Sequence, residues 1–149
     1  MPEALCVISS EVLIIEIPAF YQQLLSGPGA ATLSVCSRDG SIQSTLVWPD
    51  FDGEFIRLSM VAGSPKEASI RREKKATLLM SHASNENMYI SLRCELHEIT
   101  GSGAIEHLNM ITLRNMNVSR WYGEVEPEDS PSKDKTVLVY LRPVRVYHA

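Results

Sequence analysis

The sequence predicts a mainly β fold, in which six antiparallel strands and a few short helices form a small barrel. Several short segments alternate between apolar and polar residues, which is the period of a half-buried strand. Two Asp-Gly pairs, Asp39-Gly40 and Asp52-Gly53, are typical of tight turns between antiparallel strands. The length of 149 residues fits one domain, residues 1–149, and closure into a barrel would leave no exposed strand edge.

The first part of the chain contains an ambiguous apolar segment and then a helix. Within residues 1–16, "EVLIIEI" is compatible with a strand or with the start of a helix. Pro18 suits the first position of a helix and Gly27 ends the pattern. We therefore expect a helix over about residues 18–26.

A hairpin follows this helix. In "ATLSVCSRDGSIQSTLVW", residues 31–48, two alternating arms flank the first Asp-Gly turn. The next strand, "EFIRLSM", places Ile56, Leu58 and Met60 on one face. We expect these three strands to form a meander.

The middle of the chain predicts a helix between two strands. "PKEASIRREK" is expected to be a short basic helix, and "KATLLMSH" the strand after it. A loop, "ASNEN", then leads to a long strand, "MYISLRCELHEIT". The residues expected to point inward from this strand are Ile90, Leu92, Cys94 and Leu96.

The last part of the chain predicts a helix, a polar loop and a final strand. "SGAIEHLNMITLRNMN" has apolar residues near helical spacing. These residues are Ile105, Leu108, Ile111 and Met116. "GEVEPEDSPSKDK" is expected to be a mobile polar loop, and "TVLVYLRPVRVY" a strand in which Pro143 indicates an edge or a bulge.

Composition and charge exclude several classes of function. The net charge of −4 argues against nucleic acid as a partner, because a phosphate backbone favours a basic surface. The three cysteines are widely spaced and the four histidines show no metal-ligand spacing, so we expect reduced thiols, no metal and a cytoplasmic location. Acidic residues interrupt the apolar N-terminal segment, which argues against a signal peptide or a membrane span. No nucleophile–base arrangement is visible in the sequence.

The stretch "GSPK" stands where a strand gives way to the basic helix. Gly63, Ser64 and Lys66 at a helix N-terminus would bind an anion such as phosphate. The alternative is that Gly and Pro end the strand and Lys66 is a surface lysine in a connecting segment. Arg71 and Arg72, five and six residues after Lys66, would either form a solvated face of the helix or contribute to phosphate binding.

The order of these motifs resembles the flavin-binding split-barrel superfamily related to pyridoxamine 5′-phosphate oxidase. Within it, the chain is similar to the branch that uses the deazaflavin coenzyme F-420. The matching segments are "GPGAATLSVCSRDGSIQSTLVWPDFDGEFIRLS", "GSPKEASIRRE", "TLL", "EIT", "RWYG" and "RPVRV". The resemblance spans about residues 18–147 and implies a six-stranded antiparallel split β-barrel of the FMN-binding type.

The resemblance also implies a homodimer with FMN or coenzyme F-420 in clefts at its interface. The ring of the cofactor would lie against the strand that holds residues 43–48, with its phosphate near Lys66. The implied activity is hydride transfer between the cofactor and a small organic acceptor. The expected cofactor-binding residues are Ser44, Thr45, Leu46, Val47, Trp48, Ser59, Met60, Gly63, Ser64, Lys66, Arg71, Tyr89 and Trp121.

Several of these residues have an alternative structural explanation. The strand residues before Trp48, and Trp48 itself, would also serve packing of the core or of a dimer. Tyr89, with Met88 and Arg93, would either reach the partner's cofactor or lie on the surface. Trp121 and Tyr122 would either cap the cleft or anchor a helix.

The chain departs from the family pattern at positions that bear on function. Ser64 stands where the family often has arginine, Ser69 where it often has asparagine, and Cys94 where glycine is usual. Residues 73–75 replace an Asp-Pro-Arg sequence. These departures favour a second hypothesis, a non-catalytic cofactor carrier, sensor or stress-related split-barrel protein. A third hypothesis is a dimer with an empty cleft that serves as an interaction scaffold.

Overall fold

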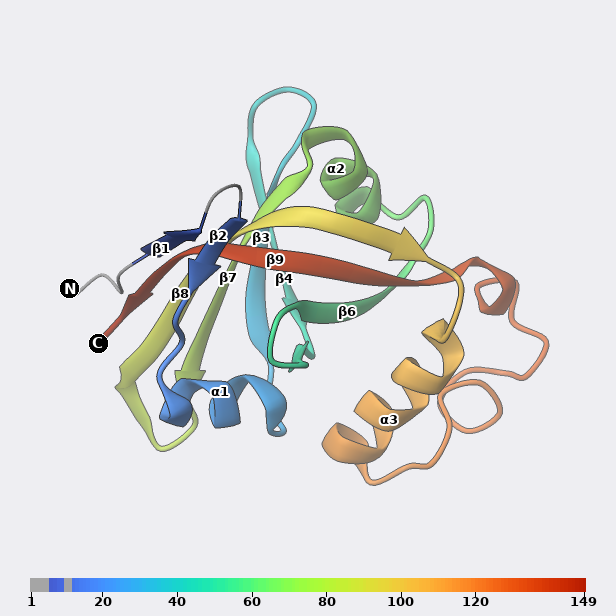
Figure 1. Ribbon diagram of the computed structural model, residues 1–149. Helices are drawn as coiled ribbons and strands as arrows, with labels where there is room; N and C mark the ends of the chain where they lie inside the picture. The colour runs from blue at the N-terminus through green and yellow to red at the C-terminus, as the bar shows by residue number, and fades with distance from the viewer. Residues whose placement is uncertain (1–5, 10–11) are drawn as a thin grey trace.

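The fold is built on one curled antiparallel sheet (Figure 1). The computed structural model describes residues 6–9 and 12–149. The strands of the main sheet lie in the order β4-β3-β7-β8-β9-β6-β5. Their bounds are β3 (Ala31–Cys36), β4 (Ile42–Val47), β5 (Asp50–Phe51), β6 (Ile56–Val61), β7 (Lys75–His82), β8 (Asn85–Thr100) and β9 (Thr136–His148). A separate pair, β1 (Cys6–Ser9) and β2 (Val12–Ile15), resolves the ambiguity of the apolar N-terminal segment in favour of a strand.

The helices pack around this sheet. They are α1 (Ala19–Ser26), α2 (Pro65–Glu73), α3 (Ala104–Met116) and the short 3-10 helix η1 (Lys133–Lys135). In Figure 1, α1 and α3 lie below the curled sheet and α2 lies beside the β3–β4 hairpin. Among the described residues, no helix has both the length and the apolar character that crossing a bilayer would require.

The two edges of the main sheet meet at one point. β4 and β5 are the edge strands, yet only Trp48 and Pro49 lie between them in the chain. Two intervening residues span at most about 11 Å. The sheet must therefore curl until its edges approach each other, which agrees with the mainly β, antiparallel barrel predicted from the sequence. The two-residue strand β5 accounts for the difference from the six strands expected.

The predicted meander is wrong in its third strand. β3 and β4 form the expected hairpin, but β6 pairs with β9 and with β5 instead of lying beside β4. Pro49 interrupts the chain after β4 because it has no N–H to donate to a ladder. The turn at Gly53, where φ is +101°, then folds β6 back onto β5.

The structure decides two smaller predictions, one about a loop and one about Pro143. The expected loop "ASNEN" is mostly strand, because β8 begins at Asn85 and pairs there with His82. Pro143 lies at a bulge, as one alternative predicted. The register between β8 and β9 shifts where Pro143 faces Cys94 and Arg145 faces Arg93. The strand is not an edge, since β9 lies between β8 and β6.

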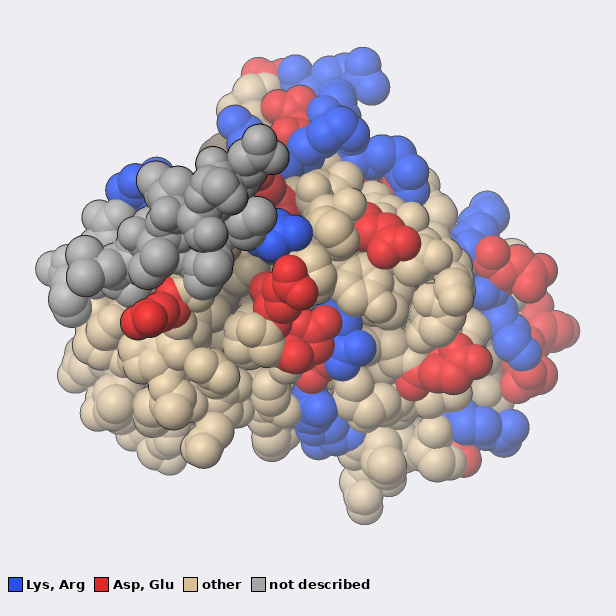
Figure 2. Space-filling model, viewed as in Figure 1, with Lys and Arg blue, Asp and Glu red and all other residues tan. Residues whose placement is uncertain are grey.

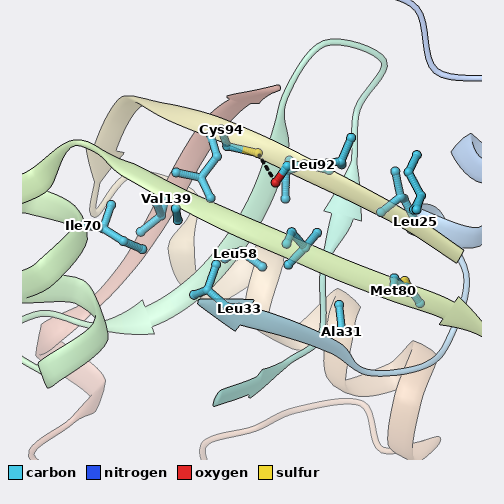
Figure 3. Packing of buried hydrophobic residues seen from close by; sticks show 14 of the residues in the cluster. Leu25, Ala31, Leu33, Leu58, Ile70, Met80, Leu92, Cys94 and Val139 are labelled. Carbon is cyan, nitrogen blue, oxygen red and sulfur yellow. Dashed lines mark hydrogen bonds between the residues drawn. The ribbon is translucent and has the colours of Figure 1, made fainter. Parts of the chain in front are cut away.

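The interior of the sheet is filled by side chains (Figure 3). The alternation predicted for β8 is confirmed, since Ile90, Leu92 and Cys94 are buried while Arg93 and Glu95 are exposed. Other fully buried side chains come from β3, β6, β7, β9 and two helices. They include Leu33, Leu58, Leu78, Val139, Leu25 and Ile70. The curled sheet is thus a packed core and not a channel.

Cys94 is expected to be chemically inert in the folded protein. Complete burial raises the pKa of its thiol to about 12, so the reactive thiolate is scarce at neutral pH. Iodoacetamide at about pH 8, followed by peptide mass spectrometry, should label the partly exposed Cys36 and leave Cys94 unlabelled until the protein is unfolded. Equal labelling of the two cysteines in the native protein would contradict this prediction.

Candidate functional site

A cavity of about 560 Å³ opens beside the point where the sheet edges meet. Its walls come from β4, β6, the start of α2, α3 and the segment between α3 and β9. The apolar wall consists of Ala30, Leu46, Val47, Trp48, Leu58, Met60, Val61, Leu108 and Ile111. The aromatic and polar wall consists of Trp121, Tyr122, Ser59, Ser64, Lys66, Glu126 and Thr136. An apolar cavity with a few polar groups is the usual form of a small-molecule site.

Most of the residues predicted to bind a cofactor line this cavity. They are Leu46, Val47, Trp48, Ser59, Met60, Ser64, Lys66 and Trp121. They come from four separate segments of the chain. The fold therefore gathers at one place residues that the sequence analysis had selected separately.

The remaining predicted residues lie outside the cavity. The hydroxyl of Ser44 bonds to that of Ser34 at 2.9 Å on the outer face of the hairpin. Thr45 Oγ1 is buried and has no hydrogen-bond partner in the described part of the chain. Tyr89 lies on β8 opposite Ser81, and its carbonyl accepts a hydrogen bond from the backbone N–H of Ala149.

Gly63 and Arg71 lie at a neighbouring shallow recess, on another side of α2. The carboxylate of Glu67 accepts a 2.8 Å hydrogen bond from Arg71 Nε and a 3.4 Å one from the Gly63 N–H. Arg72 Nη2 donates to the carbonyl of Cys36 at 2.9 Å. Both arginines therefore already have partners that fix α2 to itself or to β3.

The N-terminus of α2 has unused hydrogen-bonding capacity. Gly63 makes the sharp turn with φ of +85°, Ser64 is the N-cap and Pro65 is the first helical residue. Ser64 Oγ is buried, caps no N–H and has no partner within the described residues. The N–H groups of Lys66 and Glu67 have no intrahelical acceptor, because they belong to the first turn.

Lys66 adds a full positive charge to this helix end. Its side chain is half-buried, and burial lowers the pKa of its ammonium. It forms no ion pair with any described residue, although other lysines and arginines of the chain do. A phosphate would accept hydrogen bonds from the ammonium, the free hydroxyl and the first-turn amides, so these groups fit a phosphate ester.

Two tryptophans form the aromatic part of the wall. The rings of Trp48 and Trp121 meet edge to face, with centroids 6.4 Å apart. The backbone N–H of Trp121 donates a hydrogen bond to Asn109 Oδ1 on α3 at 3.0 Å, which holds this residue in place. Its carbonyl accepts the N–H groups of Val125 and Glu126 at 2.8 and 2.9 Å. Backbone hydrogen bonds thus shape the segment that was expected to be a loose polar loop.

Basic residues gather over the last turn of α2 and the β3–β4 hairpin, where Arg71 and Arg72 are paired with Glu67 and Glu73. Figure 2 shows Lys and Arg clustered over α2 and the β3–β4 hairpin, and acidic residues intermixed over the segment after α3. The basic residues of this region are Arg38, Arg71, Arg72, Lys74 and Lys75. Such a surface attracts an anionic ligand.

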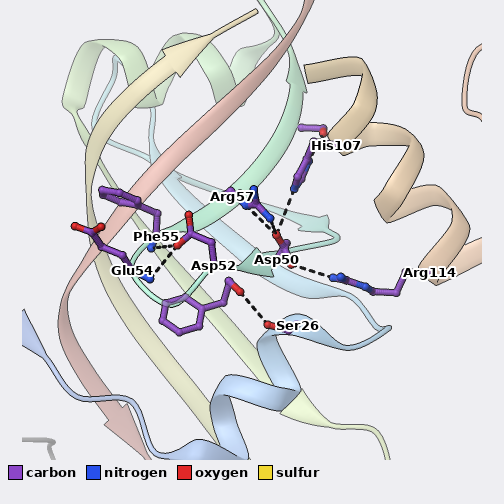
Figure 4. A network of polar contacts seen from close by, with 10 residues as sticks. Ser26, Asp50, Asp52, Glu54, Phe55, Arg57, His107 and Arg114 are labelled. Carbon is purple, nitrogen blue, oxygen red and sulfur yellow. Dashed lines mark hydrogen bonds and ion pairs between the residues drawn. The ribbon is translucent and has the colours of Figure 1, made fainter. Parts of the chain in front are cut away.

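A buried ion cluster lies behind the cavity wall, on the far side of Ser59 (Figure 4). Asp50 is 4% exposed and accepts hydrogen bonds from two arginines. Arg57 donates through Nε at 2.9 Å and also through Nη2, and Arg114 donates through Nη1 at 3.2 Å. Nε2 of His107 lies 3.7 Å from Asp50 Oδ2.

These neighbours keep Asp50 ionised. Burial by itself would raise the pKa of the carboxyl group. The interactions with His107, Arg57 and Arg114 outweigh burial and hold the pKa of Asp50 well below its usual range. The other imidazole nitrogen, His107 Nδ1, is 2.8 Å from Ser59 Oγ, which lines the cavity. The ion cluster and the cavity are therefore connected.

Comparisons with known proteins identify the fold. No model of a known protein family matches the chain, and no curated protein matches it. A solved F-420 reductase shares 21% sequence identity over 88% of this chain and 98% of its own, with a TM-score of 0.75. A proposed pyridoxamine 5′-phosphate oxidase from Listeria innocua shares 17% identity over 80% of this chain and 86% of its own, with a TM-score of 0.58.

An FMN-binding protein from Syntrophomonas wolfei shares 15% identity over 80% of this chain and 76% of its own, with a TM-score of 0.54. The chain has the split-barrel fold. The resemblance drawn from the sequence motifs is thereby confirmed at the level of the fold.

The Asp50–His107 part of this split barrel was not predicted from the sequence. The apolar residues expected near helical spacing in α3 were Ile105, Leu108, Ile111 and Met116, but Met116 is 42% exposed and His107 is buried. The spacing of Ala104, His107 and Ile111 is equally helical, but the polarity of histidine conceals it. The contacts with Asp50 and Ser59, which are far away in the sequence, explain why His107 points inward.

Replacing Asp50 should destabilise the split barrel. Asp50→Asn would leave Arg57 and Arg114 without their anion. We expect a loss of about 3 kcal/mol in the free energy of unfolding, at the low end for a broken buried ion pair because both guanidiniums are about a quarter exposed. Denaturant titration at neutral pH measures this difference. Glu54→Gln, at an exposed partner of Arg142, is the matched control and should cost little.

The stabilising effect of Asp50 should also depend on pH. The pKa of Asp50 is lower in the folded state than in the unfolded state. Its contribution is therefore complete above the unfolded value, about 4, and is lost as the pH falls toward the folded value. The difference in stability between wild type and Asp50→Asn should narrow below about pH 4. A difference that stays constant on acidification would show that the charge of Asp50 is not what stabilises the fold.

Proposed function

We propose that the protein binds a phosphate-bearing flavin-type cofactor, FMN or coenzyme F-420, in this cavity and transfers a hydride between it and a small organic acceptor. The observation that carries the proposal is the N-terminus of α2. Ser64 Oγ lacks a partner and Lys66 lacks a counter-charge among the described residues, at the edge of an apolar and aromatic cavity. Structural neighbours that include an F-420 reductase and an FMN-binding protein support the choice of cofactor class.

The proposed phosphate site consists of Ser64, Lys66 and the first-turn N–H groups of α2. Gly63 gives the turn its shape. Arg71 lies at the neighbouring recess, beyond Glu67, where it suits a more distant part of a polyanionic tail such as that of F-420. FMN and F-420 both carry a phosphate for the nearer site, so this site does not distinguish them.

The proposed ring site lies in the cavity at Leu46, Val47 and Trp48 and continues beyond it along the backbone of Ser44 and Thr45 on β4. β4 is an edge strand of the main sheet, so one side of its backbone is not paired with any described strand. These N–H and C=O groups are available to the polar edge of a flavin-type ring. Leu46, Val47, Met60 and Trp121 would enclose its faces and exclude water. The bound cofactor would supply the hydride chemistry, while the protein binds and orients it.

The outer face of the β4–β3–β7 part of the sheet supports a homodimer. Ile42 and Leu46 on β4 are 68% and 73% exposed, and Leu79 on β7 is 44% exposed. Leu46 and Leu79 both lie opposite Thr32, so they belong to one row across the sheet. A second copy covering this face would bury the row and complete the cavity from the side of Leu46. Tyr89 would then be the residue that reaches the partner's site.

Lys66→Ala should weaken cofactor binding. Loss of a charge-assisted hydrogen bond corresponds to about 1–3 kcal/mol of binding free energy. Titration of the purified protein with FMN and with F-420, followed by absorbance and fluorescence, measures the change. Lys75→Ala removes a charge from the same basic surface but not from the cavity, and it should leave the affinity nearly unchanged. Equal affinities for the wild type and Lys66→Ala would reject the phosphate assignment.

Adding a small acceptor to the protein with bound reduced cofactor distinguishes an enzyme from a carrier. A reduced cofactor that binds saturably and is reoxidised by a small acceptor indicates an oxidoreductase. Saturable binding without reoxidation by any acceptor would instead favour the carrier hypothesis.

The protein should be a dimer of its 16.6 kDa chain in solution. Sedimentation velocity is expected to give twice that mass for the wild type. Ile42→Glu, which places a charge on the same exposed face of the sheet, should shift the distribution toward the monomer, whereas Glu54→Gln should not. A wild-type protein that is monomeric at all concentrations would exclude the proposed interface.

A further inference from the structure

A chain of three side chains leads from the buried ion cluster to the cavity. Asp50 lies at the start of β5, His107 on α3 and Ser59 on β6. His107 is 5% exposed, and its imidazole separates the carboxylate from the hydroxyl. The distances are 3.7 Å from Nε2 to Asp50 Oδ2 and 2.8 Å from Nδ1 to Ser59 Oγ. Ser59 lines the cavity, and the ion-cluster end of the chain is buried.

The carboxylate determines which nitrogen of the neutral imidazole carries the proton. A carboxylate only accepts hydrogen bonds, so the nitrogen that faces Asp50 is more stable as Nε2–H. At 3.7 Å the attraction is electrostatic, and His107 Nε2 has no hydrogen-bond partner among the described residues. Nδ1 is then unprotonated and accepts the hydroxyl proton of Ser59. The oxygen of Ser59 thus presents only lone pairs to the cavity.

Protonation of His107 reverses the direction of this hydrogen bond. When both nitrogens carry protons, Nδ1–H donates to Ser59 Oγ, and the hydroxyl proton of Ser59 turns toward the cavity. One added proton therefore converts Ser59 from an acceptor into a donor for a bound molecule. If the Ser59 hydroxyl had only a packing role, it would not require a hydrogen bond to a buried histidine that in turn faces a carboxylate.

We propose that Ser59 is a catalytic residue that exchanges a proton with the substrate, that His107 holds this proton through Ser59, and that the substrate is one whose reduction places a proton on oxygen, such as a carbonyl compound or the corresponding alcohol. This inference rests on the proposed redox function. His107 and Asp50 are positioning residues, because they act through Ser59 and do not touch the substrate.

The step balances in atoms and electrons. In the direction of reduction, a bound reduced flavin-type cofactor would supply the hydride for the carbonyl carbon and would be the group oxidised. The carbonyl oxygen takes the hydroxyl proton of Ser59 as the C=O double bond becomes a single bond. Ser59 Oγ takes the proton of His107 Nδ1, which leaves neutral His107 with its Nε2–H toward Asp50. Solvent restores the proton of His107 after the alcohol leaves.

The charged surroundings of His107 come from three elements. Asp50 on β5 favours the protonated imidazole, whereas Arg57 on β6 and Arg114 on α3 oppose it and share the charge of Asp50. On the cavity side, Lys66 and Glu126 line the same space as Ser59. Because reduction requires protonated His107, the rate of reduction should fall as the pH rises, and the rate of the reverse oxidation should rise.

Two measurements test the proposal at different levels. The first needs no cofactor. NMR of histidine-labelled ¹⁵N protein should show neutral His107 as the Nε2–H tautomer, with Nδ1 unprotonated and accepting the hydroxyl proton of Ser59. A neutral Nδ1–H tautomer would overturn the relay whether or not a cofactor binds.

The second measurement uses the cofactor-loaded protein with benzaldehyde and cyclohexanone as acceptors, in single-turnover experiments. Ser59→Ala and His107→Asn should slow reduction about 100-fold, the usual contribution of a positioned acid or base. Asparagine keeps a hydrogen-bonding group near the position of Nδ1 but does not titrate, so His107→Asn should also abolish the pH dependence. Ser59→Thr keeps the hydroxyl and should restore most of the rate. His97→Asn, at an exposed histidine on β8, is the control and should change neither the rate of reduction nor its pH dependence.

The outcomes distinguish this inference from the proposed function. Titration with FMN and F-420 should still give saturable binding for Ser59→Ala and His107→Asn, because neither variant alters the phosphate site at Ser64 and Lys66. Failure of every variant to bind a cofactor rejects the proposed function. Normal binding with wild-type rates and pH profiles in both variants rejects the relay. Normal binding with no reduction of either carbonyl compound rejects the substrate class.

Discussion

The ionised carboxylate of Asp50 is the constraint on which the rest of the structure depends. It stands where the chain crosses from one edge of the sheet to the other, directly after Trp48 and Pro49. Its two arginines and one histidine come from β6 and α3, so a single buried charge joins three elements. Two of these elements, β6 and α3, also supply the wall of the cavity. Ser59 is two residues after Arg57, and Leu108 follows His107. The shape of the cavity thus depends on the interactions that neutralise the charge of Asp50.

The cavity wall contains two chemically different polar groups. At the N-terminus of α2, a positive charge and unused donors fit an anion. On β6, the hydroxyl of Ser59 is hydrogen-bonded to His107 of the ion cluster. The rest of the wall is mainly apolar and aromatic, which keeps water away and strengthens electrostatic interactions. Binding and reactivity would accordingly depend on different residues.

Local patterns predicted most of the fold, and non-local contacts decided the rest. Alternation with a period of two placed Leu92 and Cys94 inward, and the first Asp-Gly pair located the β3–β4 turn, because both effects depend on neighbouring residues. The partner of β6 was wrong, since strand order depends on how the whole sheet curls. In the site, motif resemblance selected Ser64, Lys66 and Trp121. It offered no signal for Asp50 and His107, whose proximity arises only from the packing of α3 on the sheet.

The edge-to-face pair of Trp48 and Trp121 has a consequence for spectroscopy. The chain contains two tryptophans, and both lie in the cavity wall. Intrinsic indole emission of this protein therefore originates at the cavity and reports on its polarity and occupancy without an added label. The two rings lie within 6.4 Å of each other, so both emitters experience the same change in environment. The intrinsic tryptophan fluorescence thus reports on ligand binding in the proposed cavity.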